Sequence, residues 1–469
     1  MSFVQLEFVG FYVSIFVLYW TIGDRRLQNL LLAVGSAVFY GWVHPWFLVL
    51  LYSSAVLDYS CGLAMARWQD RRGLFLAVSL AGNLGMLSYF KYFDFFVANV
   101  VTSLEMLGVS TNLHTLGIFL PVGISFYTFQ TMSYTLDIYR GKLEPRRNFL
   151  DYVVFVSFFP QLVAGPVERA ATLLPQMEKT RTLSMERMQS GVSLALWGAF
   201  KKVVIADSVA PYVDKIFILT EPAAPLVWVG AVGFAIQILA DFSGYTDIAR
   251  GTARMLGIEL MENFKHPYLA TSPSEFWRRW HISFSTWIRD YLYIPVGGSR
   301  GGFLSMTRAT FIAMLLSGLW HGASWNFVVW GAFHATLLTG YRLATPRIPK
   351  WVRELPGAQV AAVGLMFFFT CVGWLIFRET HFDRLVSYAT LSPWAASSDQ
   401  WIAAISVGAV FAWCAAPMLI ALAVERYALP QLRSSPWVLP AQTVAWTVWA
   451  LCIFSFVRTT ANDFIYFQF

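Results

Sequence analysis

The stretch AAVGLMFFFTCVGW, residues 361–374, contains no charged side chain, and the apolar residues 375–377 extend it. A helix needs roughly 17 to 20 apolar residues to cross the hydrocarbon core of a bilayer, and this stretch has that length. Similar stretches recur along the whole chain of 469 residues. The sequence therefore predicts a protein that crosses a membrane many times.

The composition agrees with this prediction and excludes a soluble globular domain. Hydrophobic residues make up 57% of the chain and charged residues only 13%, whereas soluble domains carry about 25% charged residues. The mean hydropathy is +0.54. The net charge of +7 indicates basic cytoplasmic loops rather than a nucleic-acid partner, because Lys and Arg are retained on the inner side during insertion. Lys201 and Lys202 are expected in such a loop.

The apolar runs follow one another with short polar breaks, which predicts an all-α polytopic protein with about eleven membrane helices and some re-entrant or interfacial ones. No repeat or long linker divides the chain, so residues 1–469 are expected to form a single membrane-embedded domain. The runs cover residues 4–22, 28–43, 46–66, 74–101, 114–136, 149–165, 190–219, 226–257, 308–342, 358–378, 402–424 and 437–457.

The run at 308–342 is too long for one crossing, since a helix rises about 1.5 Å per residue. It predicts either two helices or one crossing followed by a buried half-helix. Gly318, Gly322 and Gly331 are the expected breaks.

One segment cannot span a bilayer, because charges, prolines and aromatic residues alternate in it. Residues 262–302 read ENFKHPYLATSPSEFWRRWHISFSTWIRDYLYIPVGGSRGG. Residues 271–275 have the composition of a helix start, with a Ser or Thr cap, a Pro in the first turn and an acid. From Phe276 to Tyr291 aromatic residues recur mostly every three or four positions, which predicts one amphipathic helix at an interface. Residues 297–302 are expected to form a flexible turn and not a phosphate loop.

Three histidines have unusual surroundings, and His321 is the first candidate for chemistry. It lies within an apolar run, where an ionisable group is costly unless it faces a cavity or a partner. A neutral imidazole there could act as a general base on a hydroxyl that attacks an acyl carbon. The alternative is a histidine that only forms a hydrogen bond between helices. His334 is expected to be structural, and His281 lies in the polar segment.

The sequence DFSGYTD, residues 241–247, places two carboxylates after an apolar stretch. They could line a substrate passage, lie in a surface loop, pair with Arg250 and Arg254, or act as paired acids. The four cysteines lie far apart with no Cys-x-x-Cys or Cys/His spacing, so neither a disulfide framework nor a metal site is expected. They are Cys61, Cys371, Cys414 and Cys452.

Several long motifs resemble the membrane-bound O-acyltransferase family, and in particular its bacterial branch that contains the membrane subunit of alginate O-acetylation. The resemblance covers most of the chain up to about residue 378. The motifs are LPVGISFYTFQTMSYTLDIYRG at 120–141, FFPQLVAGPVERA at 158–170, DFSGYTDIARGTARMLGIELMENFKHPY at 241–268, FWRRWHISFSTWIRDYLYIPVGGSRGG at 276–302 and LLSGLWHGASWNFVVWGAFHA at 315–335.

The resemblance implies a helical membrane fold around a central tunnel. It implies that His321 is the essential histidine, acting as general base, and that His281 is a second functional histidine. Further residues are candidates for lining the tunnel or holding substrate: Trp320, Asp241, Ser243, Tyr245, Asp247, Asn263, Arg278 and Arg279. The two arginines are expected near the phosphates of coenzyme A, since guanidinium groups suit phosphate geometry, although they could instead reach lipid headgroups.

The resemblance also implies the substrates and the location. The donor would be acetyl-CoA or another cytoplasmic thioester, used as a co-substrate without a tightly bound cofactor. The acceptor would be an exported polysaccharide of alginate or cellulose type, or the hydroxyl of a periplasmic serine-esterase-like (SGNH-like) partner. The protein would lie in the lipid of the bacterial inner membrane. Two other classes stay open: a transporter of acyl groups or lipid-linked glycans, and a structural subunit of an export complex.

Overall fold

The computed structural model describes residues 1–163, 165–428, 438–457 and 464–465. Regular secondary structure in these residues is entirely helical, as the sequence predicts. The chain forms two compact units. The first comprises residues 1–188, 252–261 and 322–324, and the second comprises residues 189–251, 262–321 and 325–469.

Seven described helices are long and apolar enough to cross a membrane. Their length and composition make the chain an all-α, multi-pass membrane protein. Two shorter apolar helices, Leu6–Thr21 and Phe149–Leu162, add to them. The seven are Phe47–Arg67, Gln69–Met106, Ala224–Met255, Gly302–His321, Ala358–Arg378, Ser398–Tyr427 and Val438–Phe456.

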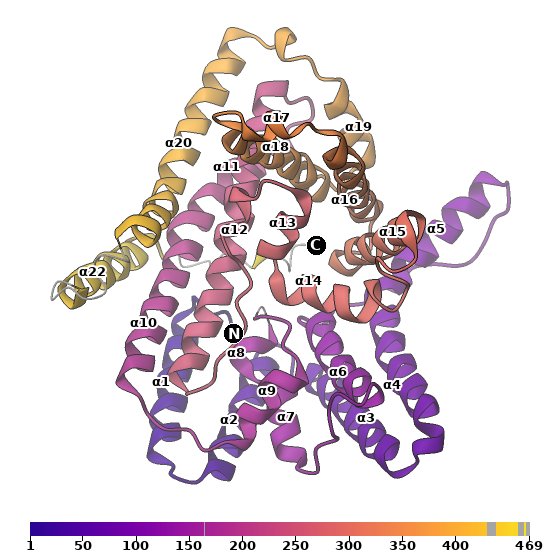
Figure 1. The fold of residues 1–469 in the computed structure, drawn as a ribbon, viewed down its shortest axis with the longest axis vertical. Helices are drawn as coiled ribbons and strands as arrows, with labels where there is room; N and C mark the ends of the chain where they lie inside the picture. Colours follow the sequence, from indigo (N-terminus) through magenta and orange to yellow (C-terminus); the bar gives the residue numbers. More distant parts are fainter. Residues whose placement is uncertain (164, 429–437, 458–463, 466–469) are drawn as a thin grey trace. The chain divides into compact units, whose positions relative to one another are not determined.

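In the first unit, buried polar side chains connect α3, α4 and α6, which lie side by side (Figure 1). Asp58 accepts hydrogen bonds from Ser79 Oγ at 2.6 Å and Asn83 Nδ2 at 2.9 Å. Thr135 of α6 lies 2.9 Å from the Ser79 hydroxyl. The first-unit helices are α1 Leu6–Thr21, α2 Arg25–Gly41, α3 Phe47–Arg67, α4 Arg72–Leu87, α5 Phe93–Met106, α6 Ile124–Tyr139, α7 Phe149–Ser157, α8 Phe159–Leu162 and α9 Ala170–Glu178.

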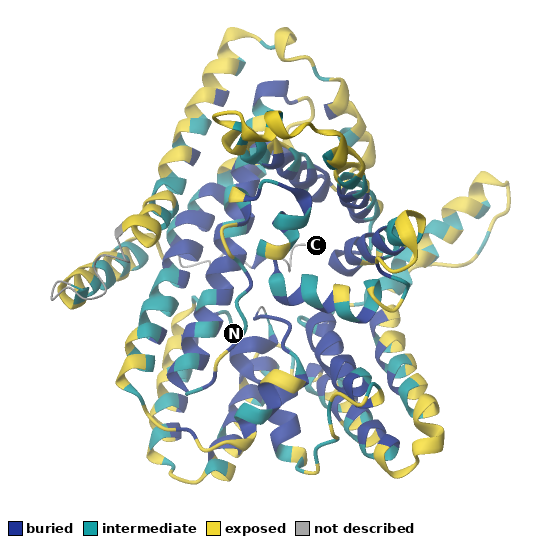
Figure 2. Ribbon diagram, in the orientation of Figure 1, coloured by how far each residue is buried: buried dark blue, intermediate teal, exposed yellow. Residues whose placement is uncertain are grey.

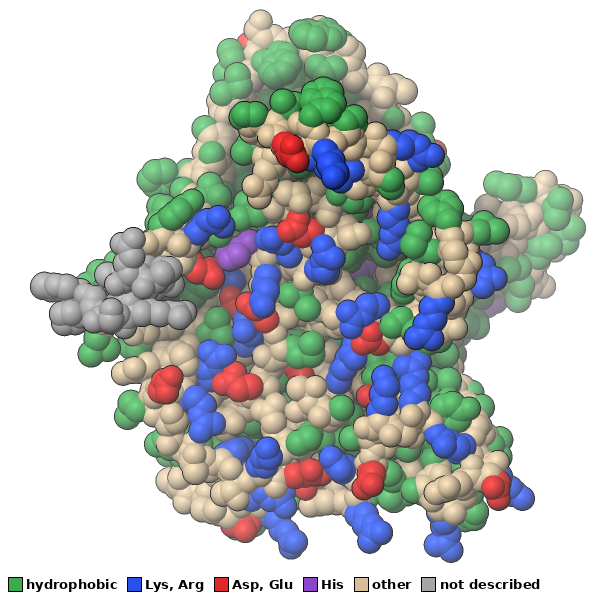
Figure 3. All heavy atoms as spheres, viewed as in Figure 1, with side chains coloured by type: hydrophobic (Ala, Val, Ile, Leu, Met, Phe, Trp, Pro, Cys, Tyr) green, Lys and Arg blue, Asp and Glu red, His purple; other side chains and the backbone are tan. Residues whose placement is uncertain are grey.

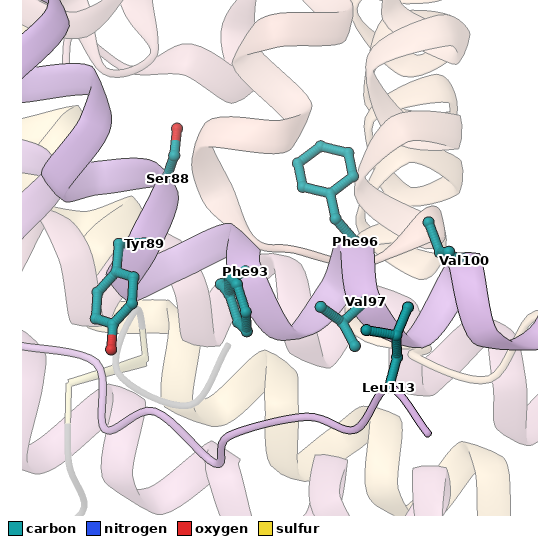
Figure 4. A pocket seen from close by; sticks show the side chains of 7 residues that line it. All are labelled: Ser88, Tyr89, Phe93, Phe96, Val97, Val100 and Leu113. Atoms are coloured by element: carbon teal, nitrogen blue, oxygen red, sulfur yellow. The ribbon is translucent and has the colours of Figure 1, made fainter. Parts of the chain in front are cut away.

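A groove in the first unit runs along α5 and the chain that follows it (Figure 4). It has a volume of about 440 Å³ and a largely apolar lining. Such a lining suits lipid chains better than polar substrates. The lining residues are Ser88, Tyr89, Phe93, Phe96, Val97, Val100 and Leu113.

In the second unit α12 is the most deeply buried of the long apolar helices, whereas α20 and α22 are mainly exposed (Figure 2). Exposed apolar surface of this extent is expected where helices face lipid. The helices here are α10 Met185–Phe200, α11 Asp207–Ile218, α12 Ala224–Met255, α13 Pro273–Arg279, α14 Ile282–Ile288, α15 Gly302–His321, α16 Trp325–Ala344, α17 Lys350–Glu354, α18 Ala358–Arg378, α19 Phe382–Thr390, α20 Ser398–Ala423 and α22 Val438–Phe456.

The long run at 308–342 forms two adjacent helices, α15 and α16, which confirms one of the two predicted arrangements. The chain leaves the helix at Gly322, as expected. Gly318 and Gly331, however, do not break it. A Cβ on Gly318 would collide with the Phe327 carbonyl oxygen, and one on Gly331 with that of Met314. These glycines instead let the two helix backbones approach closely.

We expect Gly318→Ala to destabilise the protein by about 1–3 kcal/mol, because the added methyl meets rigid backbone and forces the helices apart. Gly340 is a matched control on α16, since a Cβ there meets nothing within 4 Å. Gly340→Ala should be neutral or slightly stabilising, because alanine has the higher helix propensity. The apparent melting temperatures of the detergent-purified variants measure the difference. Equal melting temperatures would contradict the close-contact role.

Candidate functional site

The polar segment at 262–302 begins its first helix as predicted. Ser272 caps α13 by accepting a hydrogen bond from the Glu275 backbone N–H at 3.2 Å, and Pro273 occupies the first turn. The single amphipathic helix predicted from Phe276 to Tyr291 is wrong, because α13 ends at Arg279 and α14 starts at Ile282. His281 interrupts the helix with a left-handed backbone, at a φ of +43°.

Asn263 holds the chain immediately after this left-handed turn. Its side-chain oxygen accepts hydrogen bonds from Ser283, at 3.2 Å from the backbone N–H and 2.6 Å from the hydroxyl. Its main-chain oxygen accepts a third, from Ile282 N at 3.0 Å. A non-glycine residue in the left-handed region costs roughly 1–2 kcal/mol, which these bonds help to offset. Asn263 therefore fixes the conformation that orients His281.

The His281 side chain is buried, with 1% exposure, and neither ring nitrogen has a hydrogen-bond partner in the described part of the chain. Its ring lies 4.7 Å from that of Phe242 and 5.0 Å from that of Phe284. Burial lowers the pKa of His281 from 6.5 to about 3. The imidazole is therefore neutral at physiological pH and keeps one donor and one acceptor nitrogen for a ligand.

His321 is the last residue of α15, buried at 6% exposure in an aromatic enclosure. Its ring lies 5.1 Å from Trp330, 5.3 Å from Phe377 and 5.7 Å from Phe284. The adjacent Trp320 ring lies 5.0 Å away.

The two predicted histidines share ring neighbours. Phe284 and Trp320 lie 4.4 Å apart, and His281 lies 6.1 Å from Trp320. His281 and His321 therefore both contact the rings of Phe284 and Trp320, although the two histidines come from different elements.

His334 of α16 packs in the same aromatic region. Its ring lies 4.7 Å from Trp330 and 5.1 Å from Trp277, and it is stacked on Phe276 at 6.2 Å. Its Nδ1 has no partner among the described residues. These contacts agree with the predicted packing role. The Trp330 ring contacts both His334 and His321.

The 241–247 cluster lies on α12, so the surface-loop alternative is wrong. Asp241 pairs with Lys202 at 2.7 Å, and the same ammonium reaches Asp207 at 2.8 Å. Asp247 pairs with Lys201 at 2.5 Å. The prediction that these lysines lie in a basic loop is also wrong: both are buried in a π-helical segment, where burial of a charge requires a partner.

Other members of the cluster complete this network. Ser243 accepts a hydrogen bond from Lys201 Nζ at 2.9 Å, and Tyr245 is buried with its ring 5.7 Å from Lys202 Nζ. The alternative of pairing with arginine is confirmed for Arg250, which lies 3.3 Å from Asp247, but not for Arg254. Arg254 pairs with Glu259 instead, at 2.8 Å.

Arg278 and Arg279 lie outside the buried group. Arg279 pairs with Glu275 at 2.5 Å, whereas Arg278 is exposed. The face drawn in Figure 3 carries many Lys and Arg side chains among hydrophobic ones. Arg278 is therefore the more available of the two for an anionic group.

Sequence reasoning did not identify the rings that surround His321, namely Phe284, Trp330 and Phe377. The sequence did contain a signal for Trp330. It lies four residues before His334, so a helix places both side chains on one face. The lysine pair also had a signal, since two charges within an apolar run need partners.

A match to a known protein family gives evidence about function that is independent of this geometry. The model of MBOAT, the membrane-bound O-acyltransferase family, matches residues 146–381, a range that includes both His281 and His321. The chain belongs to the membrane-bound O-acyltransferase family. The chain is therefore an acyltransferase that uses an acyl donor, as the motifs indicated.

Individual relatives of this acyltransferase are similar over most of their length. A probable alginate O-acetylase of Azotobacter vinelandii is 41% identical over 388 residues, covering 82% of this chain and 76% of that protein. One of Pseudomonas syringae pv. tomato is 39% identical, covering 81% and 72%. A peptidoglycan O-acetyltransferase of Helicobacter pylori is 32% identical, covering 81% and 76%. The predicted resemblance to the alginate O-acetylation branch of the family is thus confirmed.

We expect Asn263→Ala to lower acyl transfer strongly, because it removes the acceptor that holds Ser283 and so releases the left-handed turn at His281. Ser283→Ala is the graded control, since it leaves the backbone N–H bond to Asn263 in place and should lose less activity. The stability cost of Asn263→Ala should be about 1–3 kcal/mol. Transfer rates and melting temperatures of both variants provide the test, and an Asn263→Ala variant with full activity would contradict it.

His281 should also make the stability depend on pH. Because its folded pKa is lowered from 6.5 to about 3, the unfolded chain binds more protons within that window. Stability from this residue is therefore present above about pH 6.5 and is lost as the pH falls, by roughly 1 kcal/mol per pH unit. His281→Phe should show a flatter pH dependence than the wild type in thermal unfolding. Parallel curves for the two proteins would rule this out.

Proposed function

We propose that the protein is an O-acetyltransferase of an exported bacterial polysaccharide. It moves an acetyl group from cytoplasmic acetyl-CoA to a hydroxyl group on the far side of the inner membrane. His321 serves as the general base and His281 as the second functional histidine. Residues 1–469 act as one membrane-embedded acyltransferase domain, with about eleven membrane helices around a central tunnel.

The observation that carries this proposal is the burial of His321 among aromatic rings at the end of an apolar helix. An ionisable side chain in such surroundings has a high cost and therefore marks a functional site by default. The proposal requires the neutral imidazole, because only this form can accept a proton. The aromatic enclosure keeps water from the thioester, so that the acceptor hydroxyl rather than water receives the acyl group.

The transfer step follows from these roles. The acceptor hydroxyl oxygen attacks the thioester carbonyl carbon while His321 takes the hydroxyl proton. The carbonyl electron pair moves onto its oxygen and then re-forms the double bond as the C–S bond breaks. The imidazolium returns the proton to the leaving sulfur. The products are an O-acetyl ester and a free thiol, and His321 is again neutral.

The donor side is supported by exposed positive charge. Arg278 is exposed on α13, which ends two residues before His281, and a guanidinium group suits the phosphates of coenzyme A. Arg279, which already pairs with Glu275, contributes less. The polar residues of α12, Asp241 and Asp247 among them, act through the ion pairs that hold this helix.

The acceptor side is supported by the relatives. Relatives that are 41% and 39% identical are probable alginate O-acetylases, which favours a polysaccharide of alginate or cellulose type as the final acceptor. A periplasmic serine-esterase-like partner could receive the acetyl group first and pass it to the sugar. In both routes the group that attacks at His321 is a hydroxyl.

The test is a His321→Ala variant and a His321→Gln variant in a strain that lacks the chromosomal copy. Both should lower the O-acetyl content of the secreted polysaccharide at least about 10²-fold, because neither side chain can accept the proton. The measurement is acetate released from the polysaccharide by mild base. His114→Ala is a suitable control, since His114 is an exposed histidine of the first unit.

Protein level and size-exclusion behaviour of each variant separate a loss of chemistry from a loss of folding. A well-assembled His321→Ala protein that still acetylates would overturn the proposal. It would then favour a transporter that moves acyl groups without catalysing their transfer.

A further inference from the structure

The indole of Trp330 carries a polar group that the described protein does not satisfy. Trp330 lies on α16 with 1% exposure. Its Nε1–H has no hydrogen-bond partner among the described residues. A buried donor without an acceptor costs about 1–3 kcal/mol, so such a group in a native structure calls for an explanation.

The ring that carries this donor lies next to the proposed general base. The Trp330 ring meets that of His321 edge-on, at 5.1 Å and 85°. It also contacts the rings of Trp277 at 5.7 Å and His334 at 4.7 Å. Trp277 Nε1 and His334 Nδ1 are likewise buried without a partner in the described chain. Trp330 and two of its ring neighbours therefore each carry an unsatisfied polar atom, and Trp330 itself contacts His321.

The chemistry of the indole restricts what this group can bind. Indole N–H is a donor only, so its ligand must supply a lone pair. The rings that contact Trp330 belong to neutral or aromatic side chains, namely Trp277, His321, His334 and Phe377. In this low-dielectric surrounding a neutral carbonyl oxygen is a better ligand than a permanent anion, which would need a countercharge.

We infer that Trp330 Nε1–H binds the carbonyl oxygen of the acyl thioester. This inference rests on the proposed function and adds a catalytic residue to it. When the acceptor oxygen attacks the carbonyl carbon, the C=O electron pair moves onto that oxygen and strengthens its hydrogen bond from Trp330. His321 holds the hydroxyl proton during this time. When the C–S bond breaks, the carbonyl re-forms and the proton passes to sulfur.

The test removes the N–H while keeping the ring. Trp330→Phe and incorporation of 3-benzothienylalanine at position 330, where sulfur replaces the N–H, are compared with the wild type. Permeabilised cells receive radiolabelled acetyl-CoA, and label in the polysaccharide gives kcat and KM. Both changes should lower kcat about 10²-fold, the usual effect of losing one oxyanion donor, with a smaller change in KM.

Trp374 provides a matched control. It is buried at 2% exposure in the same unit, but its Nε1–H donates to the Tyr268 hydroxyl at 3.1 Å. Trp374→Phe and 3-benzothienylalanine at 374 should affect protein yield or melting temperature more than kcat.

Each outcome decides the inference. Wild-type kcat with 3-benzothienylalanine at 330 would overturn it, and would mean that the indole only packs against neighbouring ring faces. An equal loss of kcat at positions 330 and 374 would also overturn it. These results are distinct from a failure of the proposed function, because that failure is a His321→Ala protein that still acetylates.

Discussion

The close approach of α15 and α16 determines the geometry around His321. In lipid, helices gain little from the hydrophobic effect on association, so van der Waals contact between backbones carries more of the stabilisation. Gly318 and Gly331 permit that contact, because neither position has room for a Cβ. His321 follows Gly318 by one turn and Trp330 directly precedes Gly331. The contact that joins the helices therefore also sets the 5.1 Å distance between the two rings.

Buried ion pairs stabilise α12, the helix that carries Phe242 next to His281. Two lysines inside a membrane protein would be very costly alone, but Lys202 pairs with Asp241 and Lys201 with Asp247. Removal of one partner would leave a buried charge uncompensated. Phe242 lies between these acids and touches His281 at 4.7 Å. The ion pairs thus stabilise the part of α12 that packs against His281 through Phe242.

The features that the sequence predicted correctly depend on residues close together in the chain. Apolar length predicted spans such as α18, and the Ser272 cap with Pro273 predicted the start of α13. The left-handed turn at His281 escaped prediction because it depends on Asn263, whose bonds to Ser283 cross a tertiary contact. The burial of Lys201 and Lys202 escaped prediction for a similar reason, because Asp241 and Asp247, two of their acidic partners, lie on α12. The expectation that His281 and His321 belong to one site came only from the family resemblance.

The proposed base and the proposed donor are both neutral, which suits a site within a membrane protein. A cationic oxyanion hole would stabilise the transition state more strongly, but it would leave an uncompensated charge whenever the site is empty. An indole N–H that lacks a partner costs only a few kcal/mol in the empty site. Its dipole is already fixed by the rings around it, so little reorganisation is needed as negative charge develops. In the proposed mechanism, a neutral imidazole and a neutral indole would together carry out acyl transfer without a permanent charge at His321.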